Sequence, residues 1–182
     1  MDFETERLIL RPWELSDAEA LYEYASEPLV GPIAGWAVHT SVENSREIIK
    51  TVLSAPETYA VVPKGTQKPI GSVGLMIGDK SNIGLPETEC EVGYWIGVPF
   101  WGQGLIPEAV QCLMRHGFED LQMQKMWCGC FDGNLQSKRV QEKCGFTYHH
   151  TVENVPCEAD ELLRTEHITC IAKKEWLKNM EV

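Results

Sequence analysis

A strand, a glycine-containing turn and an amphipathic helix follow one another between Glu89 and Phe118, and this stretch constrains the fold more than any other. Apolar residues alternate along its first part, which is the period of a pleated strand, and Pro99 ends the strand because proline cannot donate a ladder hydrogen bond. After the turn, apolar residues recur on one helical face from Ile106 onward. A helix that begins after glycines directs unpaired N–H groups and the positive end of its dipole forward, which suits an anion.

The turn itself reads Trp101-Gly102-Gln103-Gly104-Leu105-Ile106 and lacks the features of two common phosphate-binding motifs. A dinucleotide-binding motif requires a third glycine and a later acidic residue, and a P-loop requires Gly-Lys-Ser/Thr. An anion bound here therefore belongs to another class of cofactor. The alternative interpretation is an ordinary corner in which the glycines only permit a tight backbone.

The length of 182 residues and the 43% hydrophobic content predict one domain over residues 1–182. The acidic N-terminus lacks the regions of a signal peptide, and no apolar run is long enough for a membrane span. Seven cysteines, an odd number, indicate reduced thiols and a cytoplasmic location. The net charge of −11 disfavours nucleic acid as a partner, and it favours either a cationic substrate or mere solubility. Neither the histidines nor the cysteines have metal-ligand spacing, so no metal is expected.

The pattern along the chain predicts an α+β, mixed α/β domain without internal repeats. A capping box at Ser16–Glu19 is expected to start the first helix, and the acidic segment from Glu153 to Glu161 is expected to be a loop between the last two strands. Strands are predicted near 6–13, 59–62, 70–77, 89–98, 125–130, 146–151 and 167–172, and helices near 16–25, 41–53, 105–118 and 135–144.

Three motifs in this order resemble the GNAT superfamily of acetyl-CoA-dependent N-acetyltransferases. They are the Gln103-Gly104-Leu105 turn after a Gly93–Ile96 strand, Asn134-x-x-Ser137, and Lys143-Cys144-Gly145-Phe146. The opening Glu4–Arg11 and the Trp101–Gly104 turn resemble the RimJ/RimL-like branch, in which some members acetylate the N-terminal amines of ribosomal proteins. The resemblance implies a central, mostly antiparallel twisted sheet of six to seven strands flanked by four helices, with a splayed strand pair that holds the cofactor.

The resemblance also implies a cofactor site for acetyl-CoA. Asn134 would bond the pantetheine amides and Ser137 would lie close to the thiol sulfur. Many members carry a tyrosine four residues after the serine as general acid, whereas this chain has Gln141, so Ser137 or a water is the nearest substitute. The backbone of Ile96, Gly97 and Val98 would pair with the pantetheine arm, and the N–H groups of Trp101, Gly102, Gln103, Gly104, Leu105 and Ile106 would hold the pyrophosphate.

Acetyl transfer to an amine requires a base that makes the amine neutral and donors for the developing oxyanion. Glu91, on the cofactor-binding strand, is the predicted base, with Glu89 as its rival on the same face, and the alternative is an exposed carboxylate. The Val98 N–H is the predicted oxyanion donor. Trp36 and His39 lie where the family builds its acceptor pocket, although Trp36 can equally pack over the first helices.

The predicted function is transfer of an acetyl group from acetyl-CoA to a primary amine by direct attack in a ternary complex, above all to the N-terminal amine of a protein or peptide. A small-molecule amine acceptor, such as an antibiotic, polyamine or amino acid, is the first alternative. A non-catalytic acyl-CoA-binding module is the second, because Gln141 stands where an acid is often found. No membrane or nucleic-acid partner is expected, and the chain is predicted to be a monomer or homodimer.

Overall fold

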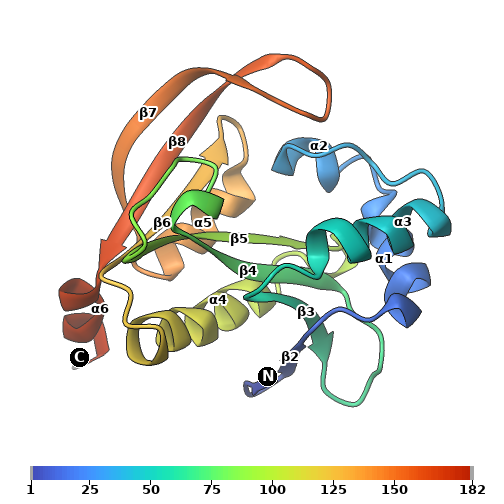
Figure 1. Cartoon of the computed structure of the whole chain (residues 1–182), viewed down its shortest axis with the longest axis horizontal. Coiled ribbons are helices and arrows are strands. Elements are labelled where there is room, and N and C mark those ends of the chain that lie inside the picture. Colours follow the sequence, from blue (N-terminus) through green and yellow to red (C-terminus); the bar gives the residue numbers. More distant parts are fainter. Residues whose placement is uncertain (1, 181–182) are drawn as a thin grey trace.

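The computed structural model describes residues 2–180, in which one large sheet carries helices on both faces (Figure 1). Short π-helical turns extend the helix Val42–Ile48 (α3) through Leu53 and the helix Leu105–Arg115 (α4) through Asp120. The strands are β1 (Phe3–Glu4), β2 (Leu8–Arg11), β3 (Thr58–Pro63), β4 (Gly71–Ile77), β5 (Glu89–Ile96), β6 (Lys125–Phe131), β7 (Thr147–Pro156) and β8 (Leu163–Ala172). The helices are α1 (Ala18–Ala25), α2 (Gly31–Ala34), α3 (Val42–Ile48), α4 (Leu105–Arg115), α5 (Leu135–Lys143) and α6 (Lys173–Met180).

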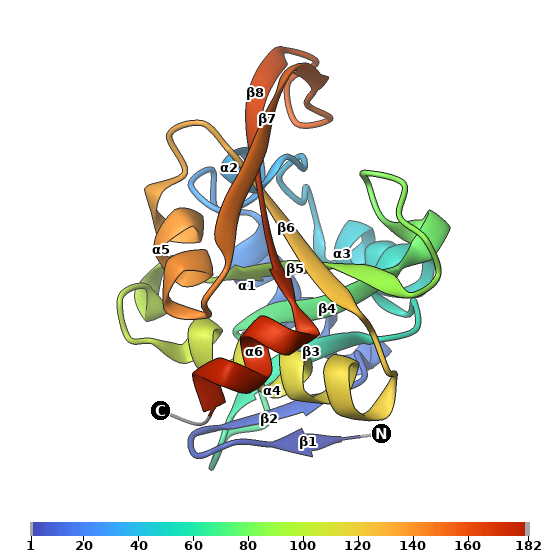
Figure 2. The same ribbon diagram turned by 90° about the vertical axis from the view of Figure 1, so that its left-hand side faces the viewer.

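The strands pair in the order β1-β2-β3-β4-β5-β6-β8-β7, and every neighbouring pair is antiparallel except β5 and β6. The predicted mostly antiparallel α+β sheet is therefore confirmed. The sheet has eight strands because Phe3 and Glu4 pair with Leu10 and Ile9, and two residues are too few to give a sequence pattern. The sheet twists strongly, and the β7–β8 hairpin stands well away from β1 and β2 (Figure 2). The helices α2 and α6 add to the four that the sequence predicts.

The two faces of the sheet bury different cores, since side chains alternate along each strand. On one face, apolar side chains of β2 to β6 pack against the buried face of α4. On the other face, Ala60 and Val62 pack against Leu21 and Ala25 of α1. The residues of β5 divide in the same way. Val92 and Tyr94 belong to the α4 face, and Trp95 belongs to the α1 face.

The start of the first helix differs from the predicted capping box at Ser16. The helix α1 begins at Ala18, and the carboxylate of Asp17 accepts the Glu14 N–H at 2.9 Å. Arg11 of β2 holds the same buried carboxylate at 2.7 Å. The prediction is wrong because this ion pair with a strand, which the local sequence does not reveal, decides which side chain caps the turn.

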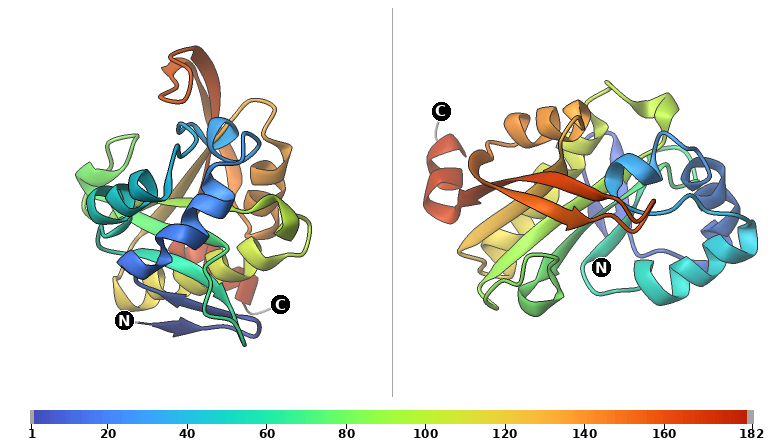
Figure 3. Two further views of the ribbon diagram at one scale, coloured as in Figure 1. Left: turned by 90° about the vertical axis from the view of Figure 1, so that its right-hand side faces the viewer. Right: turned by 90° about the horizontal axis from the view of Figure 1, so that it is seen from above.

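The acidic segment from Glu153 to Glu161 is also different from the predicted loop. The strand β7 continues to Pro156 and β8 begins at Leu163, so a long hairpin replaces most of the loop. The sequence predicts this strand only over 146–151, because nearly every residue of β7 is exposed and its continuation carries no alternation of apolar side chains. Figure 3 shows this hairpin extending over the molecule towards α2.

The strands β5 and β6 are neighbours only where they begin. Their register pairs Glu89, Cys90 and Glu91 with residues 125–127, and within residues 2–180 no later pairing joins them. Because β5 runs on to Ile96 and β6 to Phe131, the two strands separate, and Figure 1 shows β6 rising away from β5. This opening is the splayed strand pair that the sequence resemblance implies.

Two further properties concern the surroundings of the chain. No helix within the described range is long and apolar enough to span a bilayer. All seven cysteines are free thiols. Most of them pack as small core side chains, and the buried ones are Cys90, Cys128, Cys130, Cys144 and Cys157.

Candidate active site

The turn between β5 and α4 keeps a run of backbone N–H groups free. Gly102 and Gly104 have φ angles of 74° and 75°, a left-handed conformation that L side chains rarely adopt. Left-handed residues lie on either side of Gln103, and turns of this kind direct successive N–H groups into an anion-binding concavity, here at the positive end of the 11-residue helix α4. Within the described chain, no acceptor is hydrogen-bonded to the N–H groups of Gly102, Gln103, Gly104, Leu105 or Ile106. The turn therefore fits the diphosphate of a coenzyme.

Trp101 contributes to this turn through its side chain. Its N–H donates to the Val98 carbonyl at 3.1 Å, which leaves the later amides for the predicted diphosphate contact. Its indole Nε1 donates to the Ile96 carbonyl at 3.0 Å. The tryptophan thus ties the turn back to the end of β5 and fixes where the amides point.

A clamp from the N-terminal hairpin holds the same turn from outside. The Arg7 guanidinium donates to Glu108 at 2.7 Å and to the Gln103 carbonyl at 2.9 Å. The Arg7 N–H and the Thr5 hydroxyl also donate to the Glu108 carboxylate. Burial opposes ionisation of Glu108, but the hydrogen bonds from Thr5 and Arg7 outweigh it, so its pKa is lowered. The opening Thr5-x-Arg7 of the sequence is therefore physically joined to the glycine turn.

Breaking this clamp is expected to weaken cofactor binding. Arg7→Ala should raise the KM for acetyl-CoA by about threefold to fivefold with little change in kcat, because a half-exposed ion pair contributes at most about 1 kcal/mol. Steady-state kinetics at varied acetyl-CoA concentration measures this. The matched control is Glu4→Gln, which removes the more exposed pair between Glu4 and Lys64 in the same part of the sheet. Equal KM values for Arg7→Ala and the control would show that the clamp does not position the turn.

The other side of the opening is formed by the start of α5. The Asn134 Oδ1 accepts the Ser137 N–H at 3.1 Å and so caps the helix. The Asn134 Nδ2 donates to the Ile33 carbonyl of α2 at 3.3 Å. Arg164 of β8 donates to the Pro32 carbonyl at 2.8 Å, so α2 is held from two elements. A pantetheine carbonyl in the opening would compete with Ile33 for the Asn134 N–H.

A cavity of about 610 Å³ brings the two predicted cofactor segments together, since Trp101 and the first turn of α5 both line it. This volume lies in the usual range for small-molecule and cofactor sites. Arg139 and Arg164 also line it, but Arg164 is already paired with the Asp160 carboxylate, so Arg139 is the cation in its wall that forms no salt bridge within residues 2–180. The volume and the Arg139 cation of this cavity, together with the free amides of the turn that follows Trp101, fit an anionic coenzyme.

The end of β5 offers fewer free groups than the sequence suggests. The Gly97 N–H donates to the Ile70 carbonyl at 2.8 Å, and the Gly97 carbonyl accepts the Phe100 N–H at 3.0 Å. In contrast, the Val98 N–H has no acceptor within residues 2–180. The proposed oxyanion donor is therefore unengaged, whereas the Gly97 backbone is committed to the sheet and the following turn.

Glu91 is the last residue of β5 that pairs with β6, so it lies at the apex of the opening between the two strands. Only 5% of Glu91 is exposed. The Asn82 backbone N–H donates to it at 2.8 Å and the Asn82 Nδ2 at 3.4 Å. Burial raises its pKa, and the hydrogen bonds from Asn82 offset only part of that effect. A carboxylate with a raised pKa is a stronger base than an exposed one, so the geometry suits proton removal from an amine.

Two other carboxylates lie near Glu91. Glu89, the predicted rival, is at the closed end of the strand pair, where the Trp127 indole donates to it. Glu166 of β8 reaches over β6, since its Oε1 occupies the space that a Cβ at Gly129 would take. Burial raises the pKa of Glu166, and the negative charge of Glu91 adds to the effect. Within the described chain neither Glu91 nor Glu166 forms a salt bridge, which leaves room for a cationic partner.

Trp36 and His39 lie on the α1 face of the sheet, the face of Trp95. The Trp36 ring packs edge to face against Trp95 at 5.7 Å and tilts against His39 at 5.5 Å. His39 is buried, its Nδ1 is 2.8 Å from Ser45 Oγ, and burial lowers its pKa, so it is neutral near pH 7. Trp36 thus has the packing role that the sequence left open, and its partly exposed ring remains available to an acceptor.

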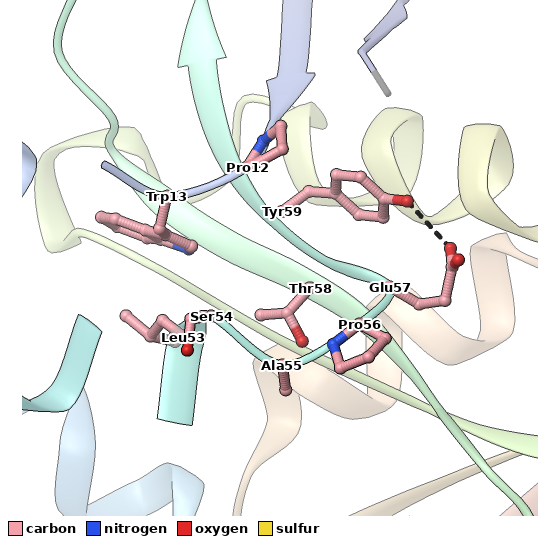
Figure 4. Close-up of a pocket in the computed structure, with 9 residues that line it drawn as sticks. All are labelled: Pro12, Trp13, Leu53, Ser54, Ala55, Pro56, Glu57, Thr58 and Tyr59. Carbon is pink, nitrogen blue, oxygen red and sulfur yellow. Dashed lines mark hydrogen bonds between the residues drawn. The ribbon is translucent and has the colours of Figure 1, made fainter. Parts of the chain in front are cut away.

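A second cavity, of about 300 Å³, lies beside the beginning of β3 (Figure 4). Its wall runs from Leu53 to Tyr59 and includes Trp13, and it contains none of the predicted site residues. The Glu57 carboxylate in this wall is already bound by the Tyr59 hydroxyl at 2.8 Å and by His116 at 3.0 Å. Across residues 2–180, no three His, Cys, Asp or Glu side chains are grouped as metal ligands.

Several residues that surround the site have no signal in the sequence. Glu166 approaches Glu91 only through the register of β8 on β6, in which Glu166 faces Phe131. Tyr94 follows the strand alternation and is read as a core residue, yet its hydroxyl lies 2.9 Å from Ser137 Oγ. Asn82 belongs to a polar loop whose path a single sequence does not specify. The sequence does give the alternation of β5, and this alternation is the only signal that could have placed Tyr94 on the α4 face of the sheet.

Known acetyltransferases match most of this chain. Residues 7–147 match the family model described as an acetyltransferase (GNAT) domain. The chain is 34% identical over 147 residues to the uncharacterized N-acetyltransferase p20 of Bacillus licheniformis, a match that covers 78% of this chain and 80% of p20. Over 56 residues, 31% of each protein, it is 34% identical to the ribosomal-protein-serine acetyltransferase of Escherichia coli.

Solved structures share the fold. An acetyltransferase of the GNAT family from Bacillus anthracis superposes with a TM-score of 0.82 at 23% identity, covering 96% of this chain and 100% of that one. The microcin C7 self immunity acetyltransferase MccE, solved with acetyl-CoA and AMP, superposes with a TM-score of 0.71 at 19% identity, covering 92% and 93%. The match to the ribosomal-protein-serine acetyltransferase supports the resemblance to the RimJ/RimL-like branch over part of the chain. The chain belongs to the GNAT family and is an acetyl-CoA-dependent N-acetyltransferase.

Proposed function

We propose that the acceptor of this acetyltransferase is the N-terminal α-amine of a protein or peptide. The observation that carries the proposal is the buried carboxylate of Glu91 at the apex of the strand opening, with Glu166 beside it and no cation bound to either in residues 2–180. An α-amine has a pKa of about 8, whereas a lysine side chain has about 10.4. Removing a proton from an α-amine therefore requires a weaker base than removing one from a lysine side chain, and a single carboxylate is better matched to the α-amine.

The residues around the opening divide the work. Acetyl-CoA supplies an activated acetyl group as a thioester. The amides of the glycine turn and Asn134 hold the coenzyme, and the Val98 N–H is directed to the oxygen that gains negative charge. Glu91 takes the proton that the amine loses when its nitrogen bonds to the acetyl carbon. Because the α1 face carries Glu91 and Trp95 while Ser137 meets Tyr94 on the α4 face, the acceptor and the leaving thiol approach from opposite faces of the sheet.

A partial match to a known enzyme and the charge of the chain favour a protein acceptor over a small molecule. The match to a ribosomal-protein-serine acetyltransferase favours a protein acceptor. The surplus of acidic side chains favours basic acceptors, which include most ribosomal proteins, through long-range attraction.

An acceptor screen tests the proposal. We expect peptides with free Ser, Ala or Met N-termini to gain one acetyl group, measured by mass spectrometry together with release of free CoA. The control is the same peptide with a blocked N-terminus and an internal lysine, which should remain unmodified. Equal acetylation of the blocked peptide, or modification of aminoglycosides or polyamines alone, would contradict the proposal. The second outcome would favour a small-molecule acceptor.

A further inference from the structure

The hydroxyl of Ser137 belongs to a hydrogen-bond network whose direction follows from its donors and acceptors. Gln141, one turn later on α5, is 2% exposed, and its Nε2 is 3.3 Å from both the Gly129 carbonyl oxygen and Ser137 Oγ. A carbonyl can only accept, so the NH₂ group of Gln141 must face Gly129. The Thr169 hydroxyl lies 2.9 Å from Gln141 Oε1 and 3.1 Å from the Cys128 carbonyl oxygen, so its one proton can go to either acceptor, and the Gly129 carbonyl is what orients the amide. The second N–H of Gln141 is thereby aimed at the Ser137 oxygen.

Tyr94 reaches the same oxygen from β5. Its hydroxyl is 2.9 Å from Ser137 Oγ and 3.1 Å from the Ser137 carbonyl oxygen. The Cys128 thiol donates to the phenol oxygen at 3.8 Å. Burial raises the pKa of Tyr94 well above its usual value and also raises that of Cys128, so both groups keep their protons near neutral pH. Tyr94 therefore keeps its one proton, which two acceptors can take, Ser137 Oγ at 2.9 Å and the Ser137 carbonyl oxygen at 3.1 Å. Of the two, Ser137 Oγ is the closer.

We propose that Tyr94 and Gln141 are positioning residues that together make Ser137 a hydrogen-bond donor to the leaving sulfur. A serine hydroxyl has one proton and two lone pairs. When Tyr94 and Gln141 both donate to the Ser137 oxygen, its lone pairs are occupied and its own proton turns into the opening between β5 and β6. Neither partner replaces the family's tyrosine as an acid, because an amide does not ionise and a buried phenolate is costly.

The chemical step then balances without proton transfer from the enzyme to sulfur. The amine nitrogen bonds to the acetyl carbon, the carbon–sulfur bond breaks, and the electron pair stays on sulfur. The Ser137 O–H stabilises that thiolate, the amine proton goes to Glu91, and the released thiolate takes a proton from water. This inference rests on the proposed placement of the coenzyme beside Ser137, and it does not depend on which amine is the acceptor.

The thiol of bound CoA reports the effect directly. Its pKa in the complex can be measured by titrating the ultraviolet absorbance of the thiolate. We expect Tyr94→Phe and Ser137→Ala each to raise that pKa by about one unit, since a hydrogen bond to a charged group is worth roughly that much. The double variant should show no larger shift than Ser137→Ala alone. The control is Tyr59→Phe, whose hydroxyl bonds Glu57 outside the site and whose complex should titrate like wild type.

Kinetics give a second readout once an acceptor is found. Tyr94→Phe should lower kcat by about tenfold with little change in the KM for acetyl-CoA, as expected when an interaction is made only in the transition state. Retention of the aromatic ring should preserve the fold, which a thermal melt verifies. A wild-type thiol pKa in Tyr94→Phe, or losses that add fully in the double variant, would overturn the inference. Failure of every peptide to be acetylated would instead contradict the proposed acceptor, because the thiol titration needs no acceptor.

Discussion

Replacing Glu91 by glutamine is expected to lower kcat at neutral pH by about tenfold or more, since general acid–base steps contribute roughly 10²–10⁴-fold. Glutamine keeps the size of the side chain, and its amide oxygen can still accept the Asn82 N–H. The fold should therefore survive, and the loss can be assigned to the missing base. Steady-state turnover with a peptide acceptor at saturating acetyl-CoA measures the effect.

The pH profile gives the same prediction an internal check. Glu91 acts as a base only when it is ionised, and burial raises its pKa above the ordinary value. In the wild type, kcat should therefore fall as the pH drops through that raised pKa, and Glu91→Gln should lack this limb. Glu89→Gln is the matched control, because Glu89 lies at the closed end of the strand pair and accepts a hydrogen bond from Trp127. Wild-type turnover in Glu91→Gln together with a loss in Glu89→Gln would transfer the role to Glu89.

Gly102→Val is expected to raise the KM for acetyl-CoA by about tenfold or more while kcat at saturation changes little. A β-branched residue is strongly disfavoured at a φ of 74°, by roughly 1–2 kcal/mol for L-residues in general. The turn should relax to negative φ and swing its N–H groups away from their common focus. No atom lies within 4 Å of the position of the added Cβ, so the backbone conformation, and not a clash, is what the substitution perturbs.

The chain contains a close control for this experiment. Gly65, in the turn between β3 and β4, has a φ of 84° and also has open space around its Cβ position. Gly65→Val should show a similar loss of thermal stability with an unchanged KM. Calorimetry gives the dissociation constant for CoA in both variants, and comparing the two separates general backbone strain from the loss of contacts between the turn and the coenzyme. An unchanged dissociation constant for CoA in Gly102→Val would mean that these amides do not bind the coenzyme.

Much of the architecture could be predicted because it depends on local patterns. The alternation of β5 and the period of α4 are visible in the sequence. The alternation places Tyr94 and Trp95 on opposite faces of the sheet. The short strand β1 and the continuation of β7 beyond Thr151 could not be predicted, since neither buries an alternating apolar side. The Asp17 cap was also missed, because its partner Arg11 comes from a strand.

The candidate site divides in a similar way. The glycine turn and the Asn134-x-x-Ser137 helix start can be identified from the sequence because their chemistry lies in consecutive residues. The approach of Glu166 to Glu91 and the contact of Tyr94 with Ser137 depend on strand register and on the packing of α5, so no spacing along the chain encodes them. The commitment of the Gly97 N–H to Ile70 is likewise a property of sheet pairing.

The amino-acid sequence by itself determined the succession of elements, the glycines that permit a left-handed turn, and the face on which each residue of β5 lies, because these follow from backbone sterics and side-chain period. Only the tertiary structure decided how far β5 and β6 separate, which carboxylates meet at their apex, and how the Ser137 hydroxyl is held. Those features arise where segments distant in sequence pack together, and their geometry is set by the sum of many weak contacts that no local pattern contains.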